Sequence, residues 1–332
     1  MGPRKGDLKE LKILNRKIKW EVDGITLEAD ERHVIEALKA LDLENAKGVA
    51  TPAVRPPKEM GSEGRAIKSV QGFNVGEDGR PLCQTGGSGV EPSDMAELDD
   101  VSTKLYRSVT ARFLYLSQDR PEITFAVREC SKKMSAPRQC DLVKLKRLGR
   151  YLKQHRRVKS WFYWGGDVSK ILCQSDSDWA GDREGRKSVS GGVLRVGHSV
   201  VKHWSKDQGN VSKSSAEAEL YACNYAADHA LGMQSMLRDM GIEAHVTVEV
   251  DSSAAIGVIG RIGLGKLRHI EVQDLWLQHA TRSGKIVVRK VKGELNDADL
   301  GTKPLTFEAI RVIMGRMDCE FVYEDTAQEG WG

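Results

Sequence analysis

The alternation of apolar and polar residues divides the chain into patterned regions separated by one stretch without periodicity. In residues 1–57, "LKILNRKIKW" and "GITLEA" predict short strands, and "DERHVIEALKALDL" predicts an amphipathic helix. Residues 58–103 contain eight glycines and many charges with little periodicity. This composition predicts a flexible linker.

Helical spacing returns at Lys104. Three successive amphipathic segments, "KLYRSVTARFLYLSQ", "PEITFAVRECSKKMS" and "CDLVKLKRLGRYLKQHRRVK", predict a helical bundle over residues 104–158. Residues 131–159 contain eleven Lys or Arg and one acid, Asp141. Such a basic face is either a solvated helix surface or a surface that contacts phosphates. The phosphate-contacting candidates are Lys144, Arg147, Arg150, Lys153 and Arg157.

Residues 159–318 change to a strand-rich rhythm. "KILCQSDS", "SGGVLRVG" and "SVVKHWS" predict three short strands, followed by a long helix that ends at Gly241. Two more strands, "VTVEVD" and "KIVVRKVKG", alternate with shorter helices. This order predicts a mixed α/β sheet of five strands flanked by helices. The last residues, 319–332, are polar and acidic and are predicted to be disordered.

Composition limits the class of protein. The 332 residues have a net charge of +4, which is too small to identify a partner. No apolar run has the length of a membrane helix, and the first residues lack the apolar core of a signal peptide. The six cysteines show no metal-ligand spacing, as expected of thiols in a reducing compartment. We therefore expect an intracellular protein, cytoplasmic or nuclear, that is neither secreted nor bound to a membrane.

Four acidic residues of the second region lie where an element begins or ends. Asp176 lies near the end of the first strand, Asp251 ends the fourth, and Glu219 lies in the first turns of the long helix. Asp299 starts the last helical segment. If the first and fourth strands are neighbours, all four carboxylates converge at one edge of the sheet. Carboxylates this close repel one another, and a pair of hard divalent cations relieves that repulsion.

Neighbouring acids compete for two of these positions. Asp178 shares the strand face of Asp176 by the period of two, but it lies further out. Asp297 directly follows Asn296 and is favoured as a helix N-cap, which makes Asp299 the better ligand candidate. Both choices stay open at this point.

Other acids near these positions have structural interpretations. "SSAE" from Ser214 is a capping box in which Glu217 reaches back to the start of the helix, which favours Glu219 as the ligand. Asp182 and Glu184 are interpreted as solvated turn residues.

Ordered motifs give the chain a family resemblance. It resembles the C-terminal part of the Pol polyproteins of copia-type LTR retrotransposons, in the ribonuclease H domain, through "SDSDWAGDREGRKSVSGG", "SKSSAEAELYA", "VDSSAAI", "LRHIEV" and "NDADLGTKPL". "LYRSVTARFLYLSQDRPEITFAVRECSKKMSAP" and "LKRLGRYLK" resemble the connection, or thumb-like, segment at 104–158. Residues 1–57 resemble a remnant of the C-terminal region of the reverse transcriptase.

The resemblance implies a fold, a reaction and a metal. The fold is a ribonuclease H-like mixed five-stranded sheet over 159–318, preceded by a mainly helical connection segment. The reaction is endonucleolytic hydrolysis of the RNA strand of RNA–DNA hybrids, recognised through the nucleic-acid backbone and the 2′-hydroxyl. Asp176, Glu219, Asp251 and Asp299 take the places of the catalytic, metal-binding acids. They would bind two Mg²⁺ ions, with Mn²⁺ as an alternative, in a chain that belongs with the remainder of a Pol polyprotein.

Two departures from the family pattern limit these expectations. Many ribonucleases H carry a histidine shortly before the last acid, and here none lies between His279 and Asp299. The only Asp-Asp pair, Asp99-Asp100, lies in the linker without a strand pattern, so no polymerase activity is expected of this fragment. The alternative function is a catalytically silent, transposon-derived fragment that binds nucleic acid through its basic helices.

Overall fold

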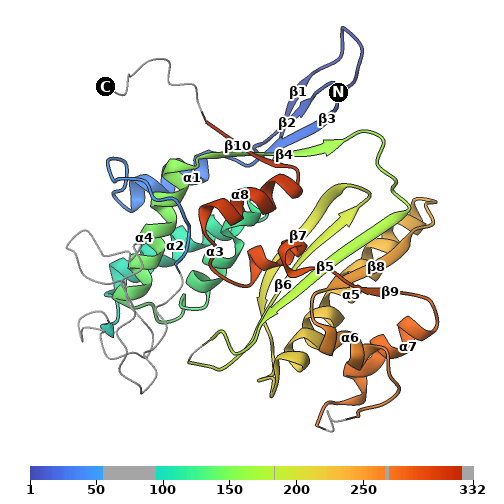
Figure 1. The fold of residues 1–332 in the computed structure, drawn as a ribbon. Helices are drawn as coiled ribbons and strands as arrows, with labels where there is room; N and C mark the ends of the chain where they lie inside the picture. The colour runs from blue at the N-terminus through green and yellow to red at the C-terminus, as the bar shows by residue number, and fades with distance from the viewer. Residues whose placement is uncertain (55–94, 183, 266–268, 324–332) are drawn as a thin grey trace.

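The computed structural model of the chain describes residues 1–54, 95–182, 184–265 and 269–323. It contains two five-stranded sheets with their accompanying helices, and the first sheet includes strands from both ends of the chain (Figure 1). Most of the predicted linker at 58–103 lies outside the described residues.

The first sheet is antiparallel throughout. In spatial order its strands are β1 (Glu10–Ile13), β2 (Arg16–Trp20), β3 (Gly24–Glu28), β4 (Arg157–Tyr163) and β10 (Cys319–Val322). The predicted strand "LKILNRKIKW" is in fact a hairpin, because Leu14 and Asn15 have positive φ angles of 49° and 63° and form a tight turn between β1 and β2.

The C-terminal strand corrects one expectation. Residues 319–332 were predicted to be disordered, and this is wrong for Cys319–Val322, which form β10. The strand exists because it pairs with β4, from Cys319↔Ser160 to Val322↔Arg157, and Phe321 packs against the apolar core. The predicted boundary at residue 159 also falls inside β4, whose strand partners are β3 and β10. Residues 324–332 lie outside the described part of the chain.

The predicted helical bundle is present. The three predicted helices are α2 (Asp100–Leu116), α3 (Thr124–Ser131) and α4 (Gln139–Gln154), with a 3₁₀ turn, η2, at Pro121–Ile123, and α1 (Arg32–Ala40), predicted separately within residues 1–57, packs with them. They share one core that includes Phe113, Leu145 and Leu148, none of them accessible to solvent. Helix α2 begins at Asp100, before the predicted Lys104, because the Asp99 side chain accepts hydrogen bonds from the N–H groups of residues 101 and 102. The Asp-Asp pair therefore starts a helix and does not lie in a hairpin between strands.

The second sheet confirms the predicted mixed topology of five strands. In spatial order they are β7 (Ser199–Asp207), β6 (Val189–Val196), β5 (Lys170–Asp178), β8 (His245–Val250) and β9 (Val287–Lys290). Strands β5, β6 and β7 are antiparallel, whereas β8 and β9 run parallel to β5. The first and fourth predicted strands, β5 and β8, are neighbours, which was the condition for the four acids to converge.

Helices cover and extend this sheet (Figure 1). The long α5 (Ser215–Asp239) packs across β5, β6 and β8. The remaining helical elements are α6 (Ser253–Ile259), η3 (Val272–Leu275), α7 (Trp276–Arg282), η4 (Gly293–Leu295), η5 (Asp297–Gly301) and α8 (Phe307–Arg316). Within the described residues, no helix has the length and apolar character needed to cross a membrane.

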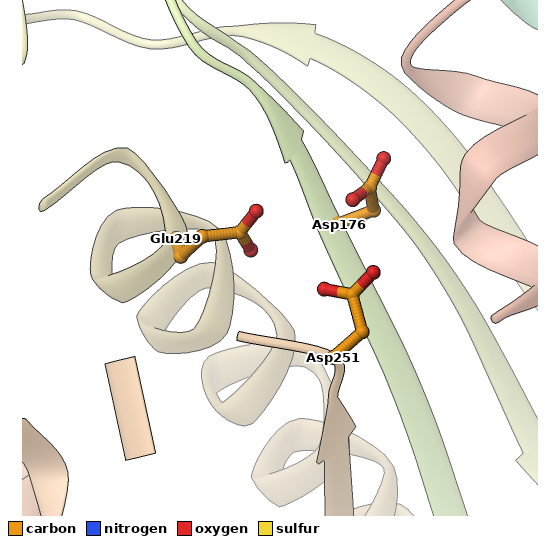
Figure 2. A group of neighbouring side chains, drawn as sticks. All are labelled: Asp176, Glu219 and Asp251. Carbon is orange, nitrogen blue, oxygen red and sulfur yellow. The ribbon is translucent and has the colours of Figure 1, made fainter. Parts of the chain in front are cut away.

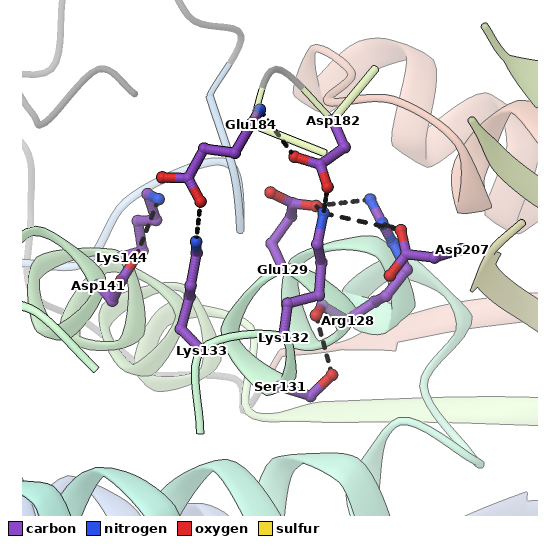
Figure 3. A network of polar contacts seen from close by, with 10 residues as sticks. All are labelled: Arg128, Glu129, Ser131, Lys132, Lys133, Asp141, Lys144, Asp182, Glu184 and Asp207. Carbon is purple, nitrogen blue, oxygen red and sulfur yellow. Dashed lines mark hydrogen bonds and ion pairs between the residues drawn. The ribbon is translucent and has the colours of Figure 1, made fainter. Parts of the chain in front are cut away.

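Ion pairs join the helical bundle to the second sheet (Figure 3). Lys132 Nζ lies 3.1 Å from Asp182 Oδ2, and Lys133 Nζ lies 2.5 Å from Glu184 Oε2. Arg128 pairs with Asp207 at the end of β7. The β5–β6 loop is therefore anchored to α3 and the residues after it, and its acids are ion-paired as well as solvated.

Candidate metal centre

Three of the four candidate carboxylates meet at one end of the second sheet (Figure 2). Asp176 lies near the C-terminal end of β5, Asp251 directly follows β8, and Glu219 lies on α5. Each offers a carboxylate oxygen, and these oxygens all lie within 4.8 Å of one another. The predicted convergence is confirmed for these three residues, and oxygen ligands at this spacing suit a hard divalent cation.

The local sequence explains why the three acids meet. The parallel register pairs Ser175 with Val250, so the next residue on each strand, Asp176 or Asp251, emerges at the same edge. The Ser214 hydroxyl accepts from the N–H of Glu217 and fixes the start of α5.

The predicted capping box is confirmed in part. Ser214 caps the helix as expected, but the Glu217 carboxylate accepts from the N–H of Lys213, not from that of Ser214. Its Oε2 also lies 2.8 Å from His269 Nε2. Glu217 is therefore occupied by structural partners, and Glu219 is the acid that reaches the cluster.

Burial and mutual repulsion change the acidity of the cluster. Burial, followed by the charges of Asp176 and Asp251, raises the pKa of Glu219 to about 9. Burial and Asp176 also raise the pKa of Asp251. Glu219 is 8% exposed, and its Oε2 is buried without a hydrogen-bond partner. A buried carboxylate oxygen that has no donor and faces two other acids fits a site that takes a cation.

The fourth acid, Asp299, extends the cluster on the side of η5. Burial and the charge of Asp176 raise the pKa of Asp299 to about 6. Lys303 Nζ lies 2.7 Å from Asp299 Oδ1 and 3.9 Å from Asp176 Oδ2. The hydroxyl of Thr302 donates a hydrogen bond to Asp176 Oδ2. Asp299 is therefore a neighbour of Asp176, with a lysine beside both.

The rival acids have other surroundings. The carboxylate of Asp178 lies against the backbone of Gly181, whereas Asp176 points into the cluster. Asp297 is 3% exposed and pairs with Arg195 and with Arg316, each at 2.6 Å.

Asp297 was predicted to be an N-cap, and this is wrong. The cap is Asn296, whose side chain accepts from the N–H of Ala298. The two arginines compensate the buried charge of Asp297, which is why it does not serve as the cap or lie in the cluster.

The basic candidates for nucleic-acid contact all have partners within the chain. They are Lys144, Arg147, Arg150, Lys153 and Arg157. Three of them, from the second half of α4, donate to oxygen atoms of Ala46, Lys47 and Thr51. The first pairs with Asp141 at 3.2 Å, and the last pairs with Glu28 at 2.9 Å. The three contacts with residues 46–51 anchor the segment after α1, and nucleic-acid binding by the five residues stays a prediction.

Sequence reasoning missed Thr302 and Lys303. They lie three and four positions after Asp299 in "DLGTKPL", and that spacing is the only local signal for them. Their contact with Asp176, on another strand, depends on tertiary structure.

Several similar proteins are polyproteins encoded by transposons. No protein-family model matches the chain. The retrovirus-related Pol polyprotein from transposon RE1 of Arabidopsis thaliana is 29% identical over 62% of this chain and 14% of its own length. The corresponding polyprotein from transposon TNT 1-94 of Nicotiana tabacum is 24% identical over 93% of this chain and 22% of its own length. This chain is a homologue of the transposon Pol polyproteins.

The Pol polyprotein relatives are much longer than the chain. Transposon RE2 of Arabidopsis thaliana encodes one that is 26% identical over 84% of this chain, and the match covers 17% of that relative. The chain thus spans between 14% and 22% of the length of these Pol polyproteins.

Two solved structures of ribonuclease H domains are also similar. LC11-RNase H1, isolated from compost by a metagenomic approach, is 21% identical and covers 44% of this chain and 99% of its own, with a TM-score of 0.29. The N-terminal RNase H domain of Rv2228c from Mycobacterium tuberculosis is 14% identical and covers 44% and 97%, with a TM-score of 0.28. The description of the fold therefore rests on the strand order of the second sheet and not on these superpositions.

Proposed function

We propose that this chain is a metal-dependent ribonuclease H that hydrolyses the RNA strand of RNA–DNA hybrids. One observation carries the proposal. Asp176, Glu219 and Asp251 come from separate elements, and each has a carboxylate oxygen within 4.8 Å of the other two. The buried Glu219 Oε2 has no hydrogen-bond partner. A protein gains nothing in stability from such an arrangement, because the like charges repel and the buried oxygen lacks a donor. We therefore infer that the three carboxylates serve a function, namely cation binding.

The relationship to transposon Pol polyproteins supports the choice of substrate. The motifs that carry Asp176, Glu219, Asp251 and Asp299 resemble those of the ribonuclease H part of such polyproteins. RNA–DNA hybrids are the substrate that this resemblance implies. The Pol polyprotein relatives are longer than this chain, so the proposal concerns the nuclease activity alone and no polymerase.

Each acid has a role in the proposed site. Asp176 has Glu219 and Asp251 on one side and Asp299 on the other, and these four carboxylates are the residues that would hold the cations. Bound Mg²⁺ ions would supply an activated water and neutralise charge on the scissile phosphate. Glu219 must lose its proton before it binds a cation, because its pKa lies near 9 in the metal-free site.

The interval before Asp299 supplies no imidazole. It contains η4, and a β-carbon at Gly293 would lie 3.5 Å from Asp251 Oδ2, so the backbone of this turn closely approaches the cluster. No histidine lies between His279 and Asp299, so no imidazole from this interval would take part in the proposed reaction.

The test is cleavage of an RNA–DNA hybrid by the purified chain in Mg²⁺. We expect products with 3′-hydroxyl and 5′-phosphate ends, and loss of cleavage by a factor of at least about 100 in Asp251→Asn, a fall of the size seen when an electrostatic catalytic group is removed. Glu36→Gln is the matched control, because Glu36 is an exposed acid paired with Arg112 on the helical bundle. Equal cleavage by Asp251→Asn and by the unaltered chain would overturn the proposal.

The alternative is a silent fragment that binds nucleic acid. It predicts hybrid binding that depends on salt, with no Mg²⁺-dependent cleavage by any variant. A gel-shift measurement on the same hybrid, run beside the cleavage assay, separates the two functions.

A further inference from the structure

Lys303 lies beside two acids of the cluster. Its ammonium lies 2.7 Å from Asp299 Oδ1 and 3.9 Å from Asp176 Oδ2, so it touches acids from two separate elements. The two carboxylates are 20% and 6% exposed, and the lysine side chain is 31% exposed. A surface lysine that only solubilises the chain would point away from such a site.

Side-chain contacts at both ends of η5 position the backbone that precedes Lys303. The side chain of Asp297 at the start of η5 is paired with Arg195 and Arg316. At the other end, the buried Thr302 donates to Asp176. The lysine side chain, with its flexible four-carbon stem, is the part of this segment that can move.

The cluster therefore has two unlike halves. On one side, Glu219 Oε2 is buried without a hydrogen-bond partner. On the other side, the Lys303 ammonium lies beside both Asp299 and Asp176, although Asp299 Oδ1 is also buried without a partner of hydrogen-bond geometry. A cation entering the second half meets the Lys303 ammonium at contact distance, whereas at Glu219 and Asp251 in the first half the same lysine acts through its charge from further away.

We infer that Lys303 is a built-in counter-ion that occupies the second cation position and has to be displaced when that position is filled. This inference rests on the proposed metal centre. It makes cation loading sequential: the Asp176, Glu219 and Asp251 side fills first, and the Asp176 and Asp299 side fills with lower affinity because Lys303 competes. The lysine is a positioning residue for the acids, and its displaced ammonium is free to approach a phosphate.

The experiment is a titration of the full chain with Mn²⁺, in which the free ion is measured by electron paramagnetic resonance. We expect two sites of unequal affinity in the unaltered chain. Lys303→Met should tighten the weaker site roughly tenfold, because one competing charge is removed. Lys303→Arg keeps the charge and should leave the weaker site weak. Lys170→Met is the matched control, because Lys170 pairs with Asp167 at the far end of β5.

A second measurement covers the metal-free state. In EDTA, Lys303→Met should melt at a lower temperature than the unaltered chain, because the acids lose their counter-ion, and Mn²⁺ should restore most of the difference. An unchanged or weaker second site in Lys303→Met would overturn the inference while hybrid cleavage stands. Absence of Mn²⁺ binding in every variant would overturn both the inference and the proposed function.

Discussion

Arg120 and Glu122 form an ion pair that is closed to solvent, with 2.6 Å between Arg120 Nη2 and Glu122 Oε1 and side-chain exposures of 1% and 0%. The guanidinium also donates to the carbonyl oxygens of His155 and Arg156, at the junction of α4 and β4. The pair therefore connects the helical bundle to the first sheet.

Replacement of one partner should strongly destabilise the chain. We expect Arg120→Met to lower the free energy of unfolding by roughly 3–5 kcal/mol, because Glu122 would remain as an uncompensated buried charge. Urea unfolding followed by circular dichroism measures this. The exposed pair Arg112–Glu36 is the control, and Arg112→Met should change stability by less than about 1 kcal/mol. Similar effects of the two substitutions would contradict the prediction.

The acid cluster should make the metal-free chain less stable as pH rises. The pKa of Glu219 goes from an ordinary 4.5 to about 9 on folding, so between these pH values the folded state binds more protons than the unfolded state. The stabilising contribution is complete below pH 4.5 and is lost as pH rises through about 9. Melting temperatures measured in EDTA across this range should fall, and Mg²⁺ should raise them most at the alkaline end.

Glu219→Gln is the informative variant for that series. It removes the titrating group and should flatten the decline in melting temperature with pH, whereas Glu36→Gln should leave the decline unchanged. An equal decline in Glu219→Gln and the unaltered chain would show that the stability change has another source.

Gly191 of β6 should tolerate no side chain. A β-carbon there would lie 2.6 Å from the carbonyl oxygen of Ala298 and 2.7 Å from Thr302 Cγ2, so Gly191→Ala would push η5 away from the sheet. We expect a loss of roughly 1–3 kcal/mol and weaker Mn²⁺ binding, because Asp299 moves with η5. Gly232→Ala is the control: this exposed glycine of α5 has open space around it, and alanine should stabilise the helix by up to about 1 kcal/mol.

Thr302 should orient Asp176. Thr302→Val keeps the shape of the side chain and removes the donor, so the buried Asp176 carboxylate loses a hydrogen bond worth roughly 1.5–3 kcal/mol. We expect lower stability and slower hybrid cleavage. Thr302→Ser keeps the hydroxyl and should recover most of both. Recovery of neither by serine would indicate that the methyl group, and not the hydroxyl, is what matters at this position.

The sequence predicted the part of the site that depends on local signals. Strand ends marked Asp176 and Asp251, and the "SSAE" box fixed the start of α5 well enough to separate Glu219 from Glu217. Parallel pairing of β5 with β8 then brought them together. The strand ends and the helix start are marked by signals within a few residues of each acid, whereas the pairing of β5 with β8 joins distant segments and was only a condition of the prediction.

Features that depend on distant partners escaped prediction. Asp297 was interpreted as a cap because its arginine partners lie 102 and 19 positions away along the chain. The basic face of α4 was interpreted either as a solvated surface or as one that contacts phosphates, and no helical pattern reveals that three of its side chains donate to oxygen atoms in residues 46–51.

Because β10 pairs with β4, the segment from residue 164 to residue 318 begins and ends at two adjacent strands of the first sheet. The second sheet is therefore an insertion between β4 and β10, the last two strands of the first sheet. Truncation after Arg316 would strip β4 of a neighbour and expose a strand edge prone to association, and it would also remove Met317 and Cys319 from the core that they share with Val193 of the second sheet.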